Sequence, residues 1–178
     1  MNQLPQLQMK RRLECVPPGR PVPDGFLVRV AIREDAPVIA TVLTDSFEVE
    51  WDTSKVNAEL FDDPNVPVTF VVERAEEIVA TASYQTKPET DPESFWLHWV
   101  GVHTSSRGMA LGEILSLEVL NEGSRRGRKT IYLTTDDFRL AAIRTYLKLG
   151  FEPDSIHDSH RLRWKVILAE LGYSSATT

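Results

Sequence analysis

The sequence predicts a mixed α/β fold in which a central sheet carries helices on both faces. In the second half of the chain, alternating apolar segments are followed twice by segments with helical spacing. Before them, Val68 to Arg74 and Ile78 to Gln85 are typical of two strands, which the polar turn Ala75-Glu76-Glu77 joins as a hairpin. A hairpin followed by two strand–helix–strand units implies a mixed sheet covered by helices on both faces.

The first 24 residues are expected to form a Pro-rich extension. Prolines interrupt helices and lack the N–H that a sheet requires, so we expect this segment to be extended, and disordered unless it docks on the domain. These prolines are Pro5, Pro17, Pro18, Pro21 and Pro23. We place one domain at residues 25–172 and a C-terminal tail at residues 173–178.

The elements of the domain follow from periodicity and from residues typical of helix ends. Phe26 to Ile32 alternates as a strand does, and Ala36 to Phe47 has helical spacing with Pro37 in its first turn. Lys87 to Ser94, with its prolines, is a predicted loop. The remaining predicted elements are the strand Phe95 to Val102, the helix Leu111 to Arg126, the strand Lys129 to Thr135, the helix Phe138 to Leu149, the strand Phe151 to Ile156 and a more helical than extended segment from His160 to Leu171.

Composition limits the classes of function. The chain has 178 residues, of which 42% are hydrophobic and 26% charged, as in a soluble globular protein. No apolar run is long enough to span a membrane, and no apolar segment of a secretory signal follows Lys10, Arg11 and Arg12. The net charge of −6 disfavours nucleic-acid binding. A single cysteine, Cys15, excludes an internal disulfide, and we expect a cytoplasmic protein.

The connection after Val102 is the strongest functional signal. A polar loop leads from an apolar strand into a helix, and the free N–H groups and the dipole at a helix N-terminus favour an anion. Gly108 and Gly112 allow the backbone to approach a ligand, and Ala110 is almost as small. Neither the P-loop pattern nor G-x-G-x-x-G is present. On spacing alone, the alternative is an ordinary strand-to-helix turn.

Two motifs in the second half resemble those of a known family. Arg107-Gly108-Met109-Ala110-Leu111-Gly112 and the segment Ala142 to Phe151, with a predicted strand between them, are similar to the two signature motifs of the GNAT superfamily of N-acetyltransferases. The resemblance covers Val28 to Ile156 and implies a mostly antiparallel central sheet. It also implies acetyl-CoA as the acyl donor, an amine as the acceptor, and direct transfer between them. In such a family the helical segment after His160 is a departure, because a further strand is usual there.

The resemblance also implies which residues bind the coenzyme. Backbone amides of the first motif are expected to hold the pyrophosphate, with acetyl-CoA between the strands that end at Val102 and Thr135. Ser105 stands where the family favours Gln or Arg, and Arg139 stands where Asn is frequent. Arg139 can contact coenzyme phosphate or pair with a neighbouring aspartate, Asp136 or Asp137. The implied coenzyme residues are Val100, Val102, Arg107, Gly108, Ala110, Leu111, Gly112, Arg139 and Ala142.

Tyr146 and His98 are the candidate catalytic residues. The resemblance implies that Tyr146 protonates the coenzyme sulfur, whereas its helical spacing alone favours a buried core aromatic. His98 matches a histidine that helps deprotonate the amine in arylalkylamine N-acetyltransferases, and strand alternation places it on the face of Trp96 and Val100. A semi-buried structural histidine is the alternative. The competing bases are Glu48, Glu50, Asp52 and a water chain. His103, His157 and His160 lack metal-ligand spacing, and no metal is expected.

The acceptor is expected to be a cationic small-molecule or peptide amine. The stretch from Asp45 to Asp63 is acidic, which is typical either of a solvated surface or of the mouth of a site that attracts cations. Trp51, Trp96 and Trp99 are candidates for the acceptor pocket or for the core. The acceptor's identity, the acyl length and a homodimer stay open. The rival function is a non-catalytic acyl-CoA-binding regulatory module with the same fold, and a structural or nucleic-acid adaptor is a third option that rests on fold versatility alone.

Overall fold

The computed structural model describes residues 4–87 and 91–173, which form two compact units. The larger unit spans residues 12–131, and the smaller unit combines residues 1–11 with residues 132–178. Within the described ranges, no helix is both long and apolar enough to cross a membrane.

The larger unit is built on four consecutive antiparallel strands. They are β2 (Phe26–Val30), β3 (Val68–Arg74), β4 (Glu77–Gln85) and β5 (Ser94–Val102), and they lie in the order β2-β3-β4-β5. The helical elements of this unit are η1 (Arg33–Asp35), α1 (Ala36–Phe47), α2 (Thr53–Val56), η2 (Asn57–Phe61), η3 (Thr104–Ser106) and α3 (Leu111–Arg125). The predicted hairpin of β3 and β4 is present, and both Ala75 and Glu76 at its turn have positive φ, which suits the twist of the strands.

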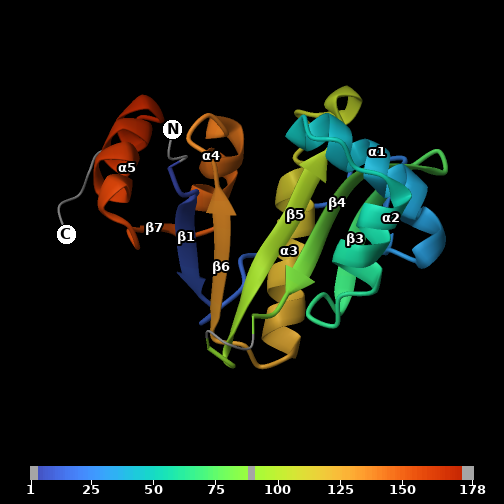
Figure 1. The fold of residues 1–178 in the computed structure, drawn as a ribbon, viewed down its shortest axis with the longest axis horizontal. Coiled ribbons are helices and arrows are strands. Elements are labelled where there is room, and N and C mark those ends of the chain that lie inside the picture. The colour runs from blue at the N-terminus through green and yellow to red at the C-terminus, as the bar shows by residue number, and fades with distance from the viewer. Residues whose placement is uncertain (1–3, 88–90, 174–178) are drawn as a thin grey trace. The chain divides into compact units, whose positions relative to one another are not determined.

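Helices cover both faces of this four-stranded sheet (Figure 1). A Cβ on Gly101 of β5 would contact Leu43 and Ser46 of α1. By contrast, Gly112 of α3 faces the side chains of Val100 and Val102. Because neighbouring residues of a strand point to opposite faces, α1 and α3 lie on opposite sides of β5.

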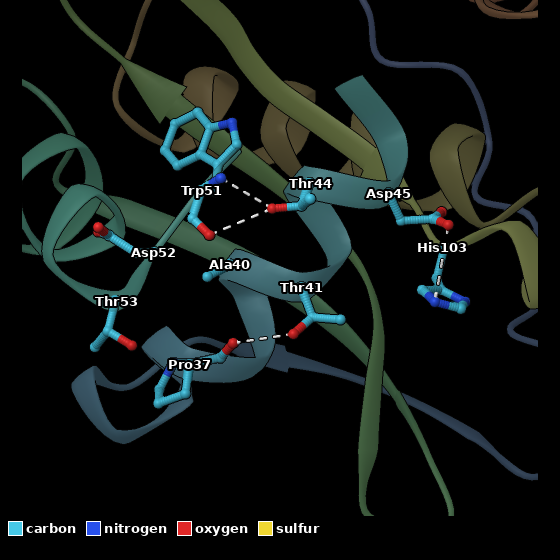
Figure 2. Close-up of a pocket in the computed structure, with 9 residues that line it drawn as sticks. All are labelled: Pro37, Ala40, Thr41, Thr44, Asp45, Trp51, Asp52, Thr53 and His103. Carbon is cyan, nitrogen blue, oxygen red and sulfur yellow. Dashed lines mark hydrogen bonds and ion pairs between the residues drawn. The ribbon is translucent and has the colours of Figure 1, made fainter. Parts of the chain in front are cut away.

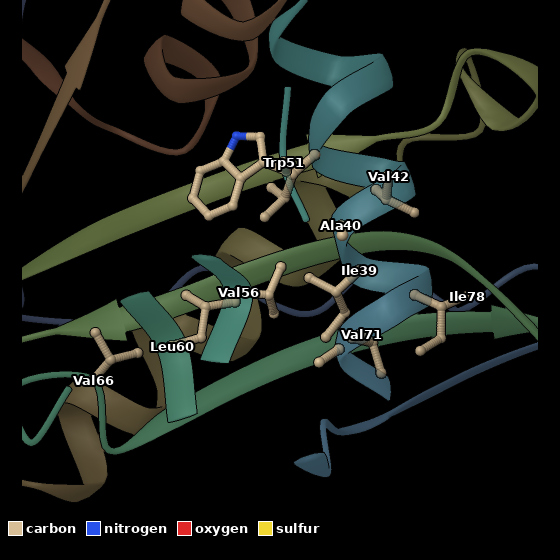
Figure 3. Close-up of a cluster of buried hydrophobic side chains, with 11 residues drawn as sticks. Ile39, Ala40, Val42, Trp51, Val56, Leu60, Val66, Val71 and Ile78 are labelled. Atoms are coloured by element: carbon tan, nitrogen blue, oxygen red, sulfur yellow. The ribbon is translucent and has the colours of Figure 1, made fainter. Parts of the chain in front are cut away.

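The α1 side of the sheet carries a continuous apolar core (Figure 3). Ile39, Val42 and Leu43 recur at helical spacing on α1 and are almost fully buried. Each such side chain contributes roughly 1.5–3 kcal/mol by leaving water. The other main members of the cluster are Ala36, Ala40, Trp51, Val56, Leu60, Val66, Val71 and Ile78. Burial on α1 and on the segment after it explains why the acidic stretch is helical rather than a plain loop.

The smaller unit contains three strands in the order β6-β1-β7. They are β6 (Thr130–Thr135), which begins at the border of the larger unit, β1 (Leu7–Arg12) and β7 (Glu152–Asp154). β1 and β7 pair antiparallel, with Gln8 opposite Asp154. The helices of this unit are α4 (Leu140–Lys148) and α5 (Asp158–Glu170).

Strand β1 lies in the predicted Pro-rich extension. Leu7 and Met9 are fully buried, and the side chains of Gln8 and Lys10 bind Asp154 of β7 at 2.8 and 2.9 Å. Only Pro5 precedes this strand, so the other prolines do not remove its ladder hydrogen bonds. Residues 7–12 are therefore extended, as predicted, but they form a strand paired with β7, which the sequence did not predict.

The remaining elements agree with the predictions apart from their ends. The mixed α/β class, the mostly antiparallel pairing and the C-terminal helix are confirmed. α4 begins at Leu140 rather than Phe138, whose side chain is 77% exposed and has no core to enter. β7 is shorter than predicted. Of the predicted loop between Lys87 and Ser94, residues 88–90 lie outside the described ranges.

Candidate functional site

The loop between β5 and α3, residues 103–110, contains residues of positive φ near its end and leads into a helix whose N-terminus has no side-chain cap. Gly108 has a φ of 80°, and Ala110, the residue before α3, has a φ of 59°. No side chain caps the N-terminus of α3, and the first intrahelical acceptor, the carbonyl of Ala110, binds the N–H of Ile114 at 3.0 Å. The N–H groups of Leu111, Gly112 and Glu113 therefore have no acceptor inside the helix. With the helix dipole, they form a site that favours an anion.

Small residues keep the approach to these N–H groups open. An added Cβ on Gly108 would have no atom within 4 Å, so this side of the loop faces free space. A Cβ added to Gly112 would be within ordinary contact distance of Val100 and Val102, while Leu111 is buried and anchors the first turn of α3. The implied coenzyme residues of β5, the loop and α3 are thus brought together. Their backbone donors fit a pyrophosphate.

A hydrogen-bond network joins the loop to α1. The side chain of Asp45, in the last turn of α1, accepts from the Thr104 N–H at 2.7 Å and from its hydroxyl at 2.9 Å. Arg107 donates to the carbonyl of Val102 at 3.3 Å, and one of its terminal nitrogens lies 3.8 Å from Asp45. Burial raises the pKa of Asp45, but the Thr104 hydrogen bonds and the charges of His103 and Arg107 outweigh it and lower that pKa. Thr104 was not predicted as a site residue, and Asp45 was predicted only as part of the acidic stretch.

Ser105, the departure from the family pattern, has a local role. Its hydroxyl lies 2.8 Å from Nδ1 of His103, and its N–H donates to the same nitrogen at 3.3 Å. His103 thereby caps the short helix η3. The structure therefore uses this pair to shape the start of the loop.

Strand β5 contains a β-bulge at Trp99. His98 lies opposite Ser83 and Gly101 opposite Thr81, so Trp99 and Val100 together face the single residue Ala82 of β4. Trp99 has a φ of 48°, a conformation that bulky residues rarely adopt and that is often found at functional sites. The bulge leaves β5 with one residue that the β4 ladder does not pair.

The bulge corrects the predicted side-chain directions along β5. Phe95 faces Gly123 of α3, so alternation turns Trp96 and His98 to the α1 side. Val100 faces α3, because Trp99 is the additional residue. His98 therefore shares a face with Trp96, as predicted, but not with Val100. The prediction failed there because regular alternation does not hold across a bulge.

His98 is held as a neutral imidazole. Burial, with a smaller contribution from the Lys87 ammonium, lowers the pKa of His98 to about 4, although Asp63 opposes the shift. Its ring lies 4.3 Å from that of Trp99. At neutral pH the side chain can accept a hydrogen bond, but with this pKa it is a weak base.

The three candidate tryptophans have different surroundings. Trp99 packs edge-on against Trp51 at 4.6 Å and Phe47 at 5.6 Å, so the bulge is anchored in the aromatic part of the α1-side core. Trp96 is buried, and the Lys87 ammonium lies over its ring at 3.6 Å. Trp51 is also buried, yet it lines a surface pocket.

That pocket, of about 520 Å³, lies along the outer side of α1 (Figure 2). Asp45 and His103 are at one end, and Trp51 and Asp52 are at the other. Its remaining lining residues are Pro37, Ala40, Thr41, Thr44 and Thr53. The predicted acidic stretch thus contributes two carboxylates to a pocket. The carboxylates of this stretch also have structural partners, since Asp52 accepts from the Lys55 N–H at 2.7 Å, Asp62 binds Arg33 at 2.5 Å and Asp63 accepts from the Asn65 N–H at 2.8 Å.

Tyr146 lies on α4 in the smaller unit and is 7% exposed. Its ring is edge-on to Phe151 at 5.9 Å. Burial raises the pKa of Tyr146 to about 12, against the opposing charge of Arg139. The hydroxyl therefore keeps its proton at neutral pH and is available as a donor.

Arg139 and Ala142 are the other predicted residues of the smaller unit. Arg139 pairs with Asp136 at 3.2 Å, the local ion pair that was one of its two predicted roles. Asp137, the other candidate, binds Arg163 at 2.7 Å. Ala142 is half-buried on α4, one turn before Tyr146. Among the residues that the structure describes, no group of three or more His, Cys, Asp or Glu can hold a metal ion.

Comparison with known proteins relates this chain to acetyltransferases. The model of the acetyltransferase (GNAT) family matches residues 36–151, more than half of the chain. Mycothiol acetyltransferase from Thermomonospora curvata is 30% identical over 155 residues, which cover 82% of this chain and 50% of that protein. The chain therefore spans about half the length of this relative.

Solved structures share the fold. A GCN5-related N-acetyltransferase from Sphaerobacter thermophilus has a TM-score of 0.68 at 22% identity, over 85% of this chain and 50% of that one. The ribosomal-protein-S18-alanine N-acetyltransferase from Escherichia coli has a TM-score of 0.62 at 19% identity, over 71% and 77% of the two chains. At these identities the likeness shows the fold alone.

Proposed function

The chain belongs to the acetyltransferase (GNAT) family, and from this premise we propose that it moves an acetyl group from acetyl-CoA to a primary amine by direct transfer. The observation that carries the proposal is the connection between β5 and α3. There, Gly108 and Ala110 have positive φ and the N-terminus of α3 has no side-chain cap. These features suit a backbone site for the coenzyme pyrophosphate.

The reaction requires the amine to lose a proton and the coenzyme thiolate to be stabilised. Bound acetyl-CoA supplies an activated thioester, whose C–S bond breaks as the C–N bond forms. We propose that the Tyr146 hydroxyl donates a hydrogen bond to the sulfur. With its pKa near 12 it is a weaker acid than a thiol, so stabilising the developing charge is its main contribution. This role requires the sulfur to come within hydrogen-bond distance of Tyr146 in the complex.

Removal of the amine proton is assigned to His98 or to a water chain that ends there. The neutral imidazole can accept a hydrogen bond from such a chain, while its low pKa leaves the final proton acceptor to solvent. We propose the pocket beside Trp51 as the place of the acceptor. Its carboxylates, Asp45 and Asp52, favour a cationic amine over a neutral or anionic one.

The first experiment is calorimetric titration of the purified protein with acetyl-CoA and, separately, with coenzyme A. Micromolar binding of both is expected. Release of free thiol is then followed with a panel of primary amines. Failure to bind either ligand would refute the proposal.

Tyr146→Phe tests the role of the hydroxyl, since it removes one oxygen and keeps the ring packing. We expect kcat to fall about 100-fold with little change in the affinity for coenzyme A. Tyr132→Phe, on β6, is the matched control. Equal turnover of Tyr146→Phe and wild type would remove Tyr146 from the mechanism.

One observation favours the rival, a regulatory module that binds acyl-CoA without turnover. The low pKa of His98 leaves the chain with a weak candidate base. The two functions differ in a single result, because the module binds coenzyme A but releases no thiol with any amine of the panel.

A further inference from the structure

We propose that Asp45 is a positioning residue that holds the β5–α3 loop in the shape that binds the coenzyme. This inference rests on the proposed function. It adds a residue of α1, outside both signature motifs, to the determinants of coenzyme affinity.

The place of Asp45 on α1 argues that its role lies outside the helix. It stands in the last turn of α1, where the helix dipole is negative and a carboxylate is unfavourable. The side chain is nevertheless only 24% exposed, so it is held against neighbouring atoms rather than directed into solvent. The partners of Asp45 must offset the unfavourable helix dipole and the partial burial of the carboxylate.

Those partners all belong to the loop. Both carboxylate oxygens accept from Thr104, one from its N–H and one from its hydroxyl. Arg107 approaches the carboxylate to 3.8 Å and also donates to the Val102 carbonyl. A single side chain of α1 is therefore connected to the first residue of η3 and to Arg107, the residue before Gly108.

His103 adds a third contact. The Ser105 N–H donates to Nδ1 of His103, and the other ring nitrogen, Nε2, lies 4.0 Å from Asp45. Three side chains of the loop, those of Thr104, Arg107 and His103, therefore lie against the Asp45 carboxylate.

The neighbouring residue Thr44 contacts the segment with Trp51 and not the loop. The Trp51 N–H donates to the Thr44 hydroxyl at 2.9 Å, and this hydroxyl donates to the Trp51 carbonyl at 3.3 Å (Figure 2). Thr44 therefore holds the segment with Trp51, while Asp45 holds the loop. Loss of the Asp45 contacts should therefore weaken coenzyme A binding in a titration that contains no acceptor amine.

The test is a double-mutant cycle with coenzyme A affinity as its readout. We expect the Kd to rise about tenfold in Asp45→Ala and about threefold in Thr104→Val, because charged hydrogen bonds are lost. The double variant should be no weaker than Asp45→Ala, since both changes remove the same contacts. Asp45→Asn keeps one acceptor oxygen and should lie between wild type and Asp45→Ala.

Glu122→Gln is the matched control. Glu122 is a similarly buried carboxylate that binds Arg125 and Arg126 at the other end of α3, and its loss should leave the Kd unchanged. Thermal unfolding of each variant separates a general loss of stability from a loss of affinity.

Two results would overturn the inference. They are an unchanged Kd in Asp45→Ala and additive effects of the two substitutions in the cycle. Absence of coenzyme binding by the wild type would overturn the proposed function as well, so the two failures are distinguishable.

Discussion

Replacing Gly123 with alanine tests how closely α3 packs on β5. Alanine is the better helix former by about 1 kcal/mol, so a helix interior alone predicts a gain in stability. In this structure, however, the added Cβ would lie 2.1 Å from Cζ of Phe95 and within 3.0 Å of two further ring carbons. That is more than 1 Å closer than ordinary van der Waals contact.

The ring of Phe95 has little freedom to move away. It is fully buried and stacked on Tyr84 at 4.7 Å, and the Tyr84 hydroxyl accepts a hydrogen bond from Arg128 at 2.9 Å. Overpacking of this kind costs up to about 3 kcal/mol. After the gain of about 1 kcal/mol in helix propensity is subtracted, we expect Gly123→Ala to lower the free energy of unfolding by about 2 kcal/mol.

Urea unfolding followed by far-UV circular dichroism measures this difference. Gly112→Ala, in the same helix, is the control, because its Cβ would be 3.6 Å from Val102 and should not lower stability. Adding Phe95→Leu to Gly123→Ala should recover part of the loss by shortening the ring side chain. A Gly123→Ala variant as stable as the wild type would refute this account of the contact.

Two further predictions concern the coenzyme loop and the proposed base. Gly108→Ala should cost about 1–2 kcal/mol and weaken coenzyme A binding, because φ is 80° there. Denaturation and calorimetry measure these effects, with Gly19→Ala as control; no change in either quantity would contradict the prediction. His98 binds fewer protons folded than unfolded between pH 6.5 and about 4, so its contribution to stability is lost as pH falls through this range. NMR titration should show no His98 transition near pH 6.5, and His98→Gln should remove this pH dependence.

Local patterns predicted most elements of the fold. α1 was predicted with its observed ends because apolar spacing, Pro37 in the first turn and the change to acidic residues after Phe47 all agree. β1 was missed because proline content was judged over 24 residues, whereas the strand occupies the proline-free part from Leu7 to Arg12. Composition averages over a segment; a strand depends on the backbone donors of particular residues.

The site was predictable only where it is local in sequence. The loop and the N-terminus of α3 are contiguous, so a motif identifies them. The contact of Asp45 with Thr104 joins residues 59 positions apart, and its one sequence sign is an acid in the last turn of a predicted helix. The bulge at Trp99 could not be predicted because apolar and aromatic residues occupy both faces of β5. No alternation of polar and apolar residues then shows which side chains share a face.

The bulge depends on a single residue and therefore on a single codon. Removal of Trp99 would place Val100 opposite Ala82, keep Gly101 opposite Thr81, and leave His98 and Gly101 on the faces they already occupy. The ladder of β4 and β5 would then be regular. The presence of one codon thus decides whether β5 pairs regularly with β4 or contains a bulge. Because the register of every other residue is the same with and without Trp99, its loss would remove the packing of its ring on Trp51 and Phe47 rather than the pairing of the strands.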